Sequence, residues 1–277
     1  GLTDSNNTPS SSTPCNVTGD DLAFARFEGD TYESKFNSSY NDNAYIGFMY
    51  GTASASSYAD AQANINPSTV LTNLNKWYTN VLSKQSNFSD SQLADTIWCN
   101  DKSVVTDTTF NPHNNQLGEN YGYGTNTNYY SASRRLISAP SNSAGGTGPS
   151  LVCPNDNNGG KLSRFTVSDT VYGNGALSGY AKVGLLTADE VAFAGSAFIS
   201  KSIYYLYGNT NSNWWTLSPS ETSYSNVNVW SVSDDGGLAV GYTVTFANGV
   251  RPSLSLVSST KVTGAGTATN PYKVIME

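Results

Sequence analysis

Three cysteines and one histidine are the side chains of this sequence most able to do covalent or acid–base chemistry. Cys15, Cys99 and Cys153 show no CxxC spacing, so the sequence does not predict a zinc site. His113 lies within an Asn-Pro-His-Asn-Asn run, which is typical of a loop with a solvated histidine. The sequence also lacks HExxH and GxSxG motifs. We therefore expect no catalytic residue, no metal site and no cofactor, and predict that the protein is not an enzyme.

The cysteines could form one disulfide bond in an oxidising compartment. Cys99 and Cys153 have similar surroundings, Trp-Cys-Asn-Asp and Val-Cys-Pro-Asn-Asp, and we favour this pair, which leaves Cys15 over. The alternative is three buried free thiols, because spacing alone does not fix the pairing of cysteines.

Composition excludes several classes of protein. The formal net charge is −7, which argues against a nucleic-acid partner because such proteins need a basic face. No apolar run approaches the roughly 20 residues of a membrane span. The sequence begins without a signal peptide or an initiator Met, as a processed chain would, which leaves room for an anchor upstream. Charged residues are only 13% and aromatic residues 12%, a pattern typical of an exported, folded, β-rich protein.

The N-terminal half contains one clear helix. Residues 1–19 are rich in Ser, Thr, Asn and Pro and are expected to form an extended arm or linker before a single domain at 20–277. Ser68 can cap a helix whose apolar residues, from Val70 to Leu82, repeat with a period of 3.6. Strands are expected at 22–27 and 45–50, a short helix or strand at 92–98, and a loop-rich insertion around 107–160.

A second helix is expected to begin at Thr187. Thr187 and Glu190 have the spacing of a capping box, and 183–186 before them reads as a buried strand. Val191, Phe193 and Ala194 are expected to form the apolar face of this helix, and Gly195 is expected to end it.

The last third of the chain reads as a series of strands. Asn248-Gly249 is a strong hairpin signal between two of them, and a last hairpin joins 261–262 to 271–275. The other strands are expected at 203–207, 214–219, 227–232, 238–240, 242–246 and 250–256. The sequence thus predicts an α+β fold, with two main helices packed on antiparallel β-sheets with long loops.

Four motifs of this region occur in an order that resembles a known family. They are Leu-Leu-Thr-Ala-Asp-Glu at 185–190, Trp-Thr-Leu-Ser-Pro at 215–219, Val-Trp at 229–230 and Gly-Val-Arg-Pro-Ser-Leu at 249–254. Together they resemble the C-type lectin fold in its formylglycine-generating-enzyme-like branch. More narrowly, the stretch from Val183 to Leu256 is similar to bacterial surface domains ending in a GVRP motif and to the variable proteins of diversity-generating retroelements.

The resemblance implies a C-type lectin-like fold with a ligand-binding face near the C-terminus. It also implies that Arg251 anchors the last core strand to nearby carbonyls or to a carboxylate, as a buried arginine requires. Trp230 is expected in the core, and Trp214 is the better candidate for exposure. Adenine mutagenesis by a retroelement would make the variable positions rich in Asn, Ser and Tyr.

Between residues 207 and 248, apolar side chains that suit a core alternate with polar, Tyr and Trp side chains that suit a contact surface. The alternative is an ordinary solvated loop face. In Asp-Asp-Gly-Gly at 234–237 we expect a turn, with oxygen ligands for calcium as the minor alternative. The predicted ligand-binding residues are Tyr207, Asn209, Asn211, Asn213, Trp214, Ser220, Ser223, Tyr224, Asn226, Asn228, Ser231, Ser233, Asp234, Asp235 and Tyr242.

These observations predict a surface-displayed domain that binds a protein or glycan ligand at a cell or virion surface without catalysis. A retroelement-diversified variable protein fits the resemblance best. The alternatives are a minor pilin-type or structural surface subunit with a fixed ligand, and an enzyme of the formylglycine-generating type. That enzyme would need paired cysteines and a copper or redox site, whereas all three cysteines lie outside the matched region.

Overall fold

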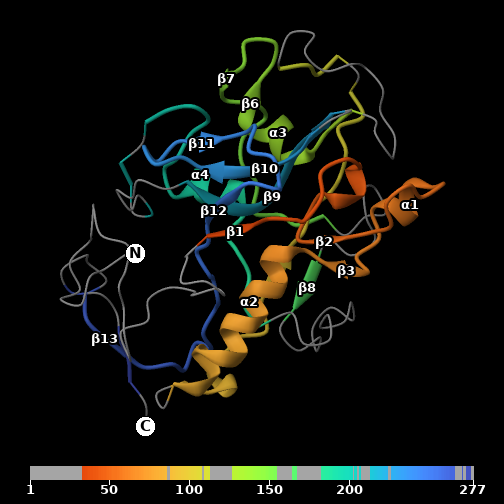
Figure 1. Ribbon diagram of the computed structural model, residues 1–277. Helices are drawn as coiled ribbons and strands as arrows, with labels where there is room; N and C mark the ends of the chain where they lie inside the picture. Colours follow the sequence, from red (N-terminus) through yellow and green to blue (C-terminus); the bar gives the residue numbers. More distant parts are fainter. Residues whose placement is uncertain are drawn as a thin grey trace.

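A six-stranded β-sheet organises the protein, here seen in a computed structural model (Figure 1). Its strand order is β1-β12-β9-β10-β11, with β5 beside β9. The strands are β1 (Glu33–Lys35), β5 (Asn128–Tyr129), β9 (Trp214–Ser223), β10 (Asn226–Val232), β11 (Leu238–Ala239) and β12 (Ala247–Gly249). The structure describes residues 33–85, 88–107, 109–112, 127–154, 164–166, 182–201, 203–204, 206, 213–223, 226–265, 270 and 273–275.

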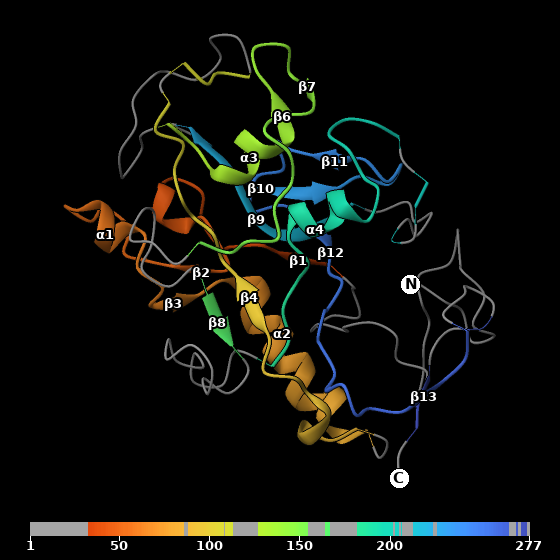
Figure 2. The same cartoon turned by 180° about the vertical axis from the view of Figure 1, so that it is seen from behind.

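The β9–β10 hairpin separates two hydrophobic clusters. Trp215 and Val229 belong to the cluster that contains helix α2 (Thr69–Asn80). Trp214 and Trp230 belong to the other, which contains α3 (Ser131–Leu136) and α4 (Ala188–Phe193). Figures 1 and 2 show α2 and the α3–α4 pair on different sides of the sheet. Both faces of the hairpin are therefore covered, and nearly every residue of β9 is buried.

Helix α2 begins where the sequence predicts. The Ser68 hydroxyl accepts a hydrogen bond from the Leu71 backbone N–H at 3.2 Å, which confirms the N-cap. Val70, Leu71 and Leu74 are buried in the first cluster. The periodic apolar residues of this helix are thus core residues, as expected.

Helix α4 is also confirmed, with one error in its apolar face. Thr187 and Glu190 form the predicted capping box, and Gly195 follows the helix with a φ of 115°, a conformation that favours glycine. Val191 is fully buried, but Phe193 is 56% exposed. The prediction for Phe193 was wrong, because this helix has fewer than two turns and buries the side that carries Val191.

The smaller elements are short helical turns and two-stranded pairs. The helical turns are α1 (Tyr58–Ala61), η2 (Asn43–Tyr45), η3 (Leu82–Lys84) and η4 (Asp90–Gln92). The antiparallel pairs are β2 (Met49–Tyr50) with β3 (Asn66–Pro67), β4 (Ile97–Cys99) with β8 (Arg164–Thr166), β6 (Ile137–Ser138) with β7 (Ser143–Ala144), and β13 (Val262–Thr263) with β14 (Lys273–Val274). The β13–β14 pair confirms the predicted C-terminal hairpin.

Several predicted strands are replaced by other backbone arrangements. Asn248 and Gly249 lie inside β12, which pairs with β1 and β9, so the hairpin predicted there was wrong. No strand lies at 242–246, or at the described residues of 203–207, and Ile203 is 90% exposed. Residues 183–186 are not a strand, although Gly184 forms a β-bridge with Ser253. The strand expected at 45–50 is reduced to β2.

The described residues of 107–160 belong to the body of the domain. They include β5, which pairs with β9, and α3, whose Ala132 and Leu136 lie in the second cluster. The predicted arm at 1–19, the predicted strand at 22–27, Cys15 and His113 lie outside the described residues. The described part of the chain is a mixed α+β structure, mostly sheet with few helices. None of its helices has the length and apolarity that crossing a membrane requires.

Candidate functional site

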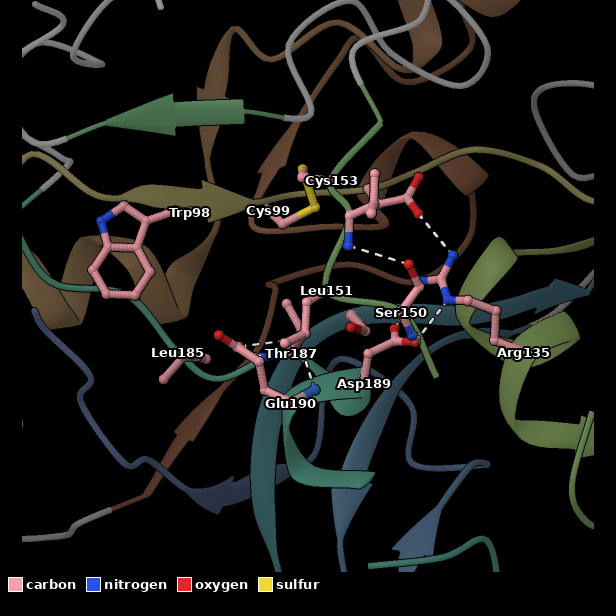
Figure 3. A pocket seen from close by; sticks show the side chains of 13 residues that line it. Trp98, Cys99, Arg135, Ser150, Leu151, Cys153, Leu185, Thr187, Asp189 and Glu190 are labelled. Carbon is pink, nitrogen blue, oxygen red and sulfur yellow. Dashed lines mark hydrogen bonds and ion pairs between the residues drawn. A yellow bond between two sulfur atoms is a disulfide. The ribbon is translucent and has the colours of Figure 1, made fainter. Parts of the chain in front are cut away.

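A cavity of about 410 Å³ opens between β4, the start of α4 and the segment Ser150–Cys153, which we call the strap (Figure 3). Its walls come from parts of the chain that are far apart in sequence. The lining residues are Trp98, Cys99, Asp101, Arg135, Ser150, Leu151, Val152, Cys153, Leu185, Thr187, Asp189, Glu190 and Ser218. We call this cavity the strap pocket.

A disulfide bond between Cys99 and Cys153 fixes one end of the strap to β4 (Figure 3). The two Cα atoms are 5.6 Å apart and the bond closes a separation of 54 residues. This is the pair that the sequence favoured, and the alternative of three free thiols is wrong. The bond joins β4 to the strap, two segments distant in sequence.

An ion-pair network fixes the other end of the strap. The Arg135 guanidinium, from α3, donates from Nε and Nη2 to the two carboxylate oxygens of Asp189, both at 2.7 Å. Nη1 lies 3.4 Å from Asp101 Oδ2. Asp189 Oδ1 also accepts the Ser150 backbone N–H at 2.9 Å. Asp189 thus binds α3 and the strap at once.

The network also sets the charge state of the pocket wall. Burial alone would lower the pKa of Arg135, but the hydrogen bonds and charges of Asp189 and Asp101 outweigh it and raise that pKa above its usual value. Arg135 is therefore a permanent cation. Because Asp189 is only 2% exposed, its charge needs this partner.

The carboxylates of the pocket are all bound within the protein. Glu190 Oε2 accepts the Thr187 N–H at 2.7 Å and the Thr187 hydroxyl at 3.0 Å, and Asp101 Oδ1 accepts the Ser103 N–H at 2.9 Å. Within the described ranges, no group of three or more His, Cys, Asp or Glu side chains could hold a metal ion. Fixed charges of this kind shape a cavity and orient a ligand.

Apolar side chains provide the free contact area at the mouth of the strap pocket. Leu151 is 66% exposed and Val152 is 76% exposed, although both lie on a strap that is fixed at two points. Trp98 and Leu185 form apolar wall further in. A rigid apolar mouth over a cavity with fixed polar groups suits capture of a ligand by shape and burial.

The structure splits the predicted binding face into two groups. Asn213, Ser233, Asp234 and Asp235 lie at the Trp214 end of the β9–β10 hairpin, where the Asp234 N–H donates to Asn213 Oδ1 at 3.1 Å. At the other end lie Ser223 and Asn226, with Tyr242 beside them because its neighbour Thr243 bridges to Asn228 and donates to Asn226. At roughly 3.3 Å per residue, the ten-residue β9 holds these ends about 30 Å apart. They are not one contact patch.

Four of the predicted residues are buried within the hairpin. Trp214 is 4% exposed, Asn228 6%, and Ser220 and Ser231 0%, so the prediction that they face outward was wrong. Asn228 Nδ2 donates to Glu221 Oε1 at 3.1 Å, inside the structure. The cause is that both faces of the hairpin are covered. Trp214 lies in the cluster of α3 and α4, whereas Ser231 pairs with Trp215, which lies in the cluster of α2. Tyr207, Asn209, Asn211 and Tyr224 lie outside the described residues.

The remaining expectations for this region concern a turn and two core residues. Asp235 Oδ1 accepts the Gly237 N–H at 3.1 Å and the Gly236 N–H donates to the Ser233 carbonyl at 2.9 Å, so 234–237 forms a turn, as expected. Trp230 is fully buried, which confirms its place in the core. Arg251 Nη1 donates to the Leu206 carbonyl, the kind of anchor that the resemblance implies.

Sequence reasoning missed most of the strap pocket, although one signal pointed to it. In a chain with only 13% charged residues, the adjacent pair Arg134-Arg135 stands out. The side chain of Arg134 pairs with Asp107 near the surface, whereas Arg135 points into the pocket. The sequence indicates Asp189 only as part of a helix start, because its link to Arg135 depends on the tertiary fold.

One family model matches part of the chain, at residues 152–258. It is DUF6273, a domain of unknown function. The matched region includes the strap's Val152 and Cys153, helix α4 and the whole β9–β10 hairpin. It also contains the entire stretch from 183 to 256 that carries the sequence resemblance. No curated protein and no solved structure matches the chain.

Proposed function

We propose that this protein is a surface-displayed ligand-binding domain of C-type lectin-like fold that acts without catalysis. Its ligand is a protein or glycan on another cell or surface. The strap pocket is its binding site, with Leu151 and Val152 as contact residues at the mouth.

The observation that carries this proposal is that two large apolar side chains stay exposed on a strap fixed at both ends. Exposed apolar residues on a mobile loop would mean little, but here a disulfide and the Asp189 hydrogen bond hold them in place. Fixing a contact surface in advance lowers the entropy lost on binding. This arrangement of Leu151 and Val152 is therefore favourable for binding a partner.

Two further features support display outside the cell. A disulfide that closes a separation of 54 residues suits an oxidising compartment. The low charge content and the abundance of Asn, Ser, Thr and Tyr suit a surface that makes polar contacts.

A matched pair of valine variants tests the proposed site. Val152→Asp puts a charge at the pocket mouth, and Val262→Asp makes the same change on β13, where Val262 is 44% exposed. Wild type and both variants are screened on glycan and peptide arrays, and each hit is measured by calorimetry. We expect Val152→Asp to weaken binding more than about tenfold, as loss of a central apolar contact does, while Val262→Asp binds like wild type.

Three results would overturn the proposal. They are no array binding by wild type, equal binding by the two variants, and turnover of an array ligand by the protein. Self-assembly of the chain into filaments with no array binding would favour the pilin-type alternative instead.

A further inference from the structure

Arg251 places its guanidinium against an aromatic wall at the Trp214 end of the β9–β10 hairpin. The Arg251 Cζ atom lies 4.4 Å from the centroid of the Trp214 ring, within the range of a cation–π contact. Nη1 donates to the Leu206 carbonyl. The plane of the guanidinium is thus fixed by one ring and one carbonyl.

The charge of Arg251 has no acidic partner among the described residues. The arginines in that part of the chain that form ion pairs are Arg134 and Arg135. Burial is the main influence on Arg251 and lowers its pKa to about 10, so it remains charged at neutral pH. A guanidinium has five N–H donors, and one carbonyl satisfies only one of them.

Arg251 is only partly buried, and none of its guanidinium nitrogens is among the fully buried side-chain atoms that lack a partner, so a ligand can reach its other donors. The Tyr204 phenol lies close enough to feel its charge: burial raises the pKa of Tyr204, and Arg251 acts against that rise. A partly desolvated guanidinium gains more from an anion than an exposed one does, because water competes less for its donors.

We propose that Arg251 and Trp214 form a carboxylate-binding subsite, in which Trp214 holds the guanidinium plane and the free N–H donors receive a carboxylate of the ligand. The carboxylate can come from an acidic sugar or from an acidic peptide. This subsite shares no residue with the strap pocket, so either site can fail without the other.

Arginine side-chain NMR tests the subsite on the wild-type protein. The chain has five arginines, so the Nε–Hε peaks of a ¹⁵N-labelled sample are few enough to assign. The probes are 3′-sialyllactose against lactose, and the N-acetylated, C-amidated peptide Gly-Asp-Glu-Gly against Gly-Asn-Gln-Gly with the same end groups. We expect the Arg251 peak to shift saturably with at least one carboxylate probe and not with its neutral match. The probe with the lower dissociation constant identifies the source of the carboxylate.

Variants then separate this subsite from general charge effects. Arg251→Lys keeps a cation but loses the planar fork, and we expect it to weaken the carboxylate probe about tenfold. Arg134→Lys, at a surface ion pair outside both proposed sites, should leave that affinity unchanged.

The inference is wrong if the Arg251 peak does not move in the wild type, or if neutral probes move it equally. It is also wrong if Arg134 shifts in parallel with Arg251, because that result indicates unspecific screening. Since these readouts come from the wild-type protein, they decide the question even where Arg251→Lys fails to fold.

Discussion

Asp189 is a single acceptor that joins three parts of the strap pocket, because it binds Arg135 through both oxygens and the Ser150 N–H through one of them. Asp189→Asn would leave the Arg135 cation without its main partner. We expect this change to lower the free energy of unfolding by about 3 kcal/mol, as measured by urea denaturation. Asp107→Asn, at the exposed pair with Arg134, is the matched control and should have no measurable effect. Equal effects of the two changes would contradict this account.

Lys102 is fully buried, and its ammonium donates to the carbonyls of Met49, at 3.1 Å, and Gln62. Burial lowers the pKa of Lys102 from 10.5 to about 7. Between these two values the unfolded chain binds more protons than the folded one, so stability rises with pH across this window and falls as the pH drops toward 7.

We expect the free energy of unfolding of the wild type to gain about 2 kcal/mol from this group between about pH 7 and about pH 9. Lys102→Met should remove that gain, whatever its effect on stability at one pH. Urea denaturation at several pH values measures the slope, with the exposed Lys84→Met as control. A slope that is unchanged in Lys102→Met would show that the folded-state pKa of Lys102 is not depressed.

At the scale of elements, the start of α2 depends on one side chain. Ser68→Ala removes the hydroxyl that accepts the Leu71 N–H, and we expect a loss of about 1 kcal/mol in unfolding free energy. Ser83→Ala, in η3 just after the end of α2, serves as the control because the Ser83 hydroxyl is exposed and donates only to the Thr79 carbonyl. Thermal unfolding should separate the two variants, and a Ser83→Ala effect as large as that of Ser68→Ala would rule out the cap as the cause.

The disulfide holds β4 and the strap together. Cys99 and Cys153 are separated by 54 residues in the sequence, and replacing both by serine removes the bond that closes this loop. The unfolded chain then gains conformational entropy, and we expect the free energy of unfolding to fall by about 4 kcal/mol. Cys15→Ser is the control. Urea denaturation gives the stability of each variant, and the array ligand of the strap pocket gives the effect on binding. Wild-type stability in the double variant would mean that the strap is held without the bond.

The sequence predicted helix starts well, because they depend on local hydrogen bonds. Ser68 and the Thr187–Glu190 box mark helix starts because the partners lie within four residues of each other. Asn248-Gly249 failed as a turn because β12 pairs with β1 and β9, strands distant in sequence, and this pairing overrides the local preference. The polar residues of β9 and β10 were misplaced for the same reason, since the elements that cover the two faces of the hairpin, α2 on one and α3 with α4 on the other, are distant in sequence.

At the scale of the whole molecule, burial determines which positions could vary if the chain is diversified by a retroelement, as the sequence resemblance implies. Variation is tolerable where side chains reach solvent and costly where they fill the core. We expect sequencing of codons 205–250 across a population, with the neighbouring DNA, to show changes at exposed or half-buried positions only. Among the described positions of the predicted face these are Asn213, Ser223, Asn226, Ser233, Asp234, Asp235 and Tyr242.

Trp214, Ser220, Asn228 and Ser231 should stay constant in the same data because they are buried. Changes spread evenly over buried and exposed positions would contradict directed diversification of a folded face. An invariant segment without a template repeat nearby would leave a domain with one fixed ligand.

The pairing of β1 with β12 joins the first described strand to one near the end of the chain. The Trp215 indole N–H adds to this link by donating to the Ser34 carbonyl, across 181 residues. The central sheet therefore cannot close until most of the polypeptide has been synthesised, and folds dominated by such distant pairings form slowly. A chain that folds late stays unfolded for longer, and an unfolded chain can pass through a translocation channel, which would suit the display outside the cell that we propose.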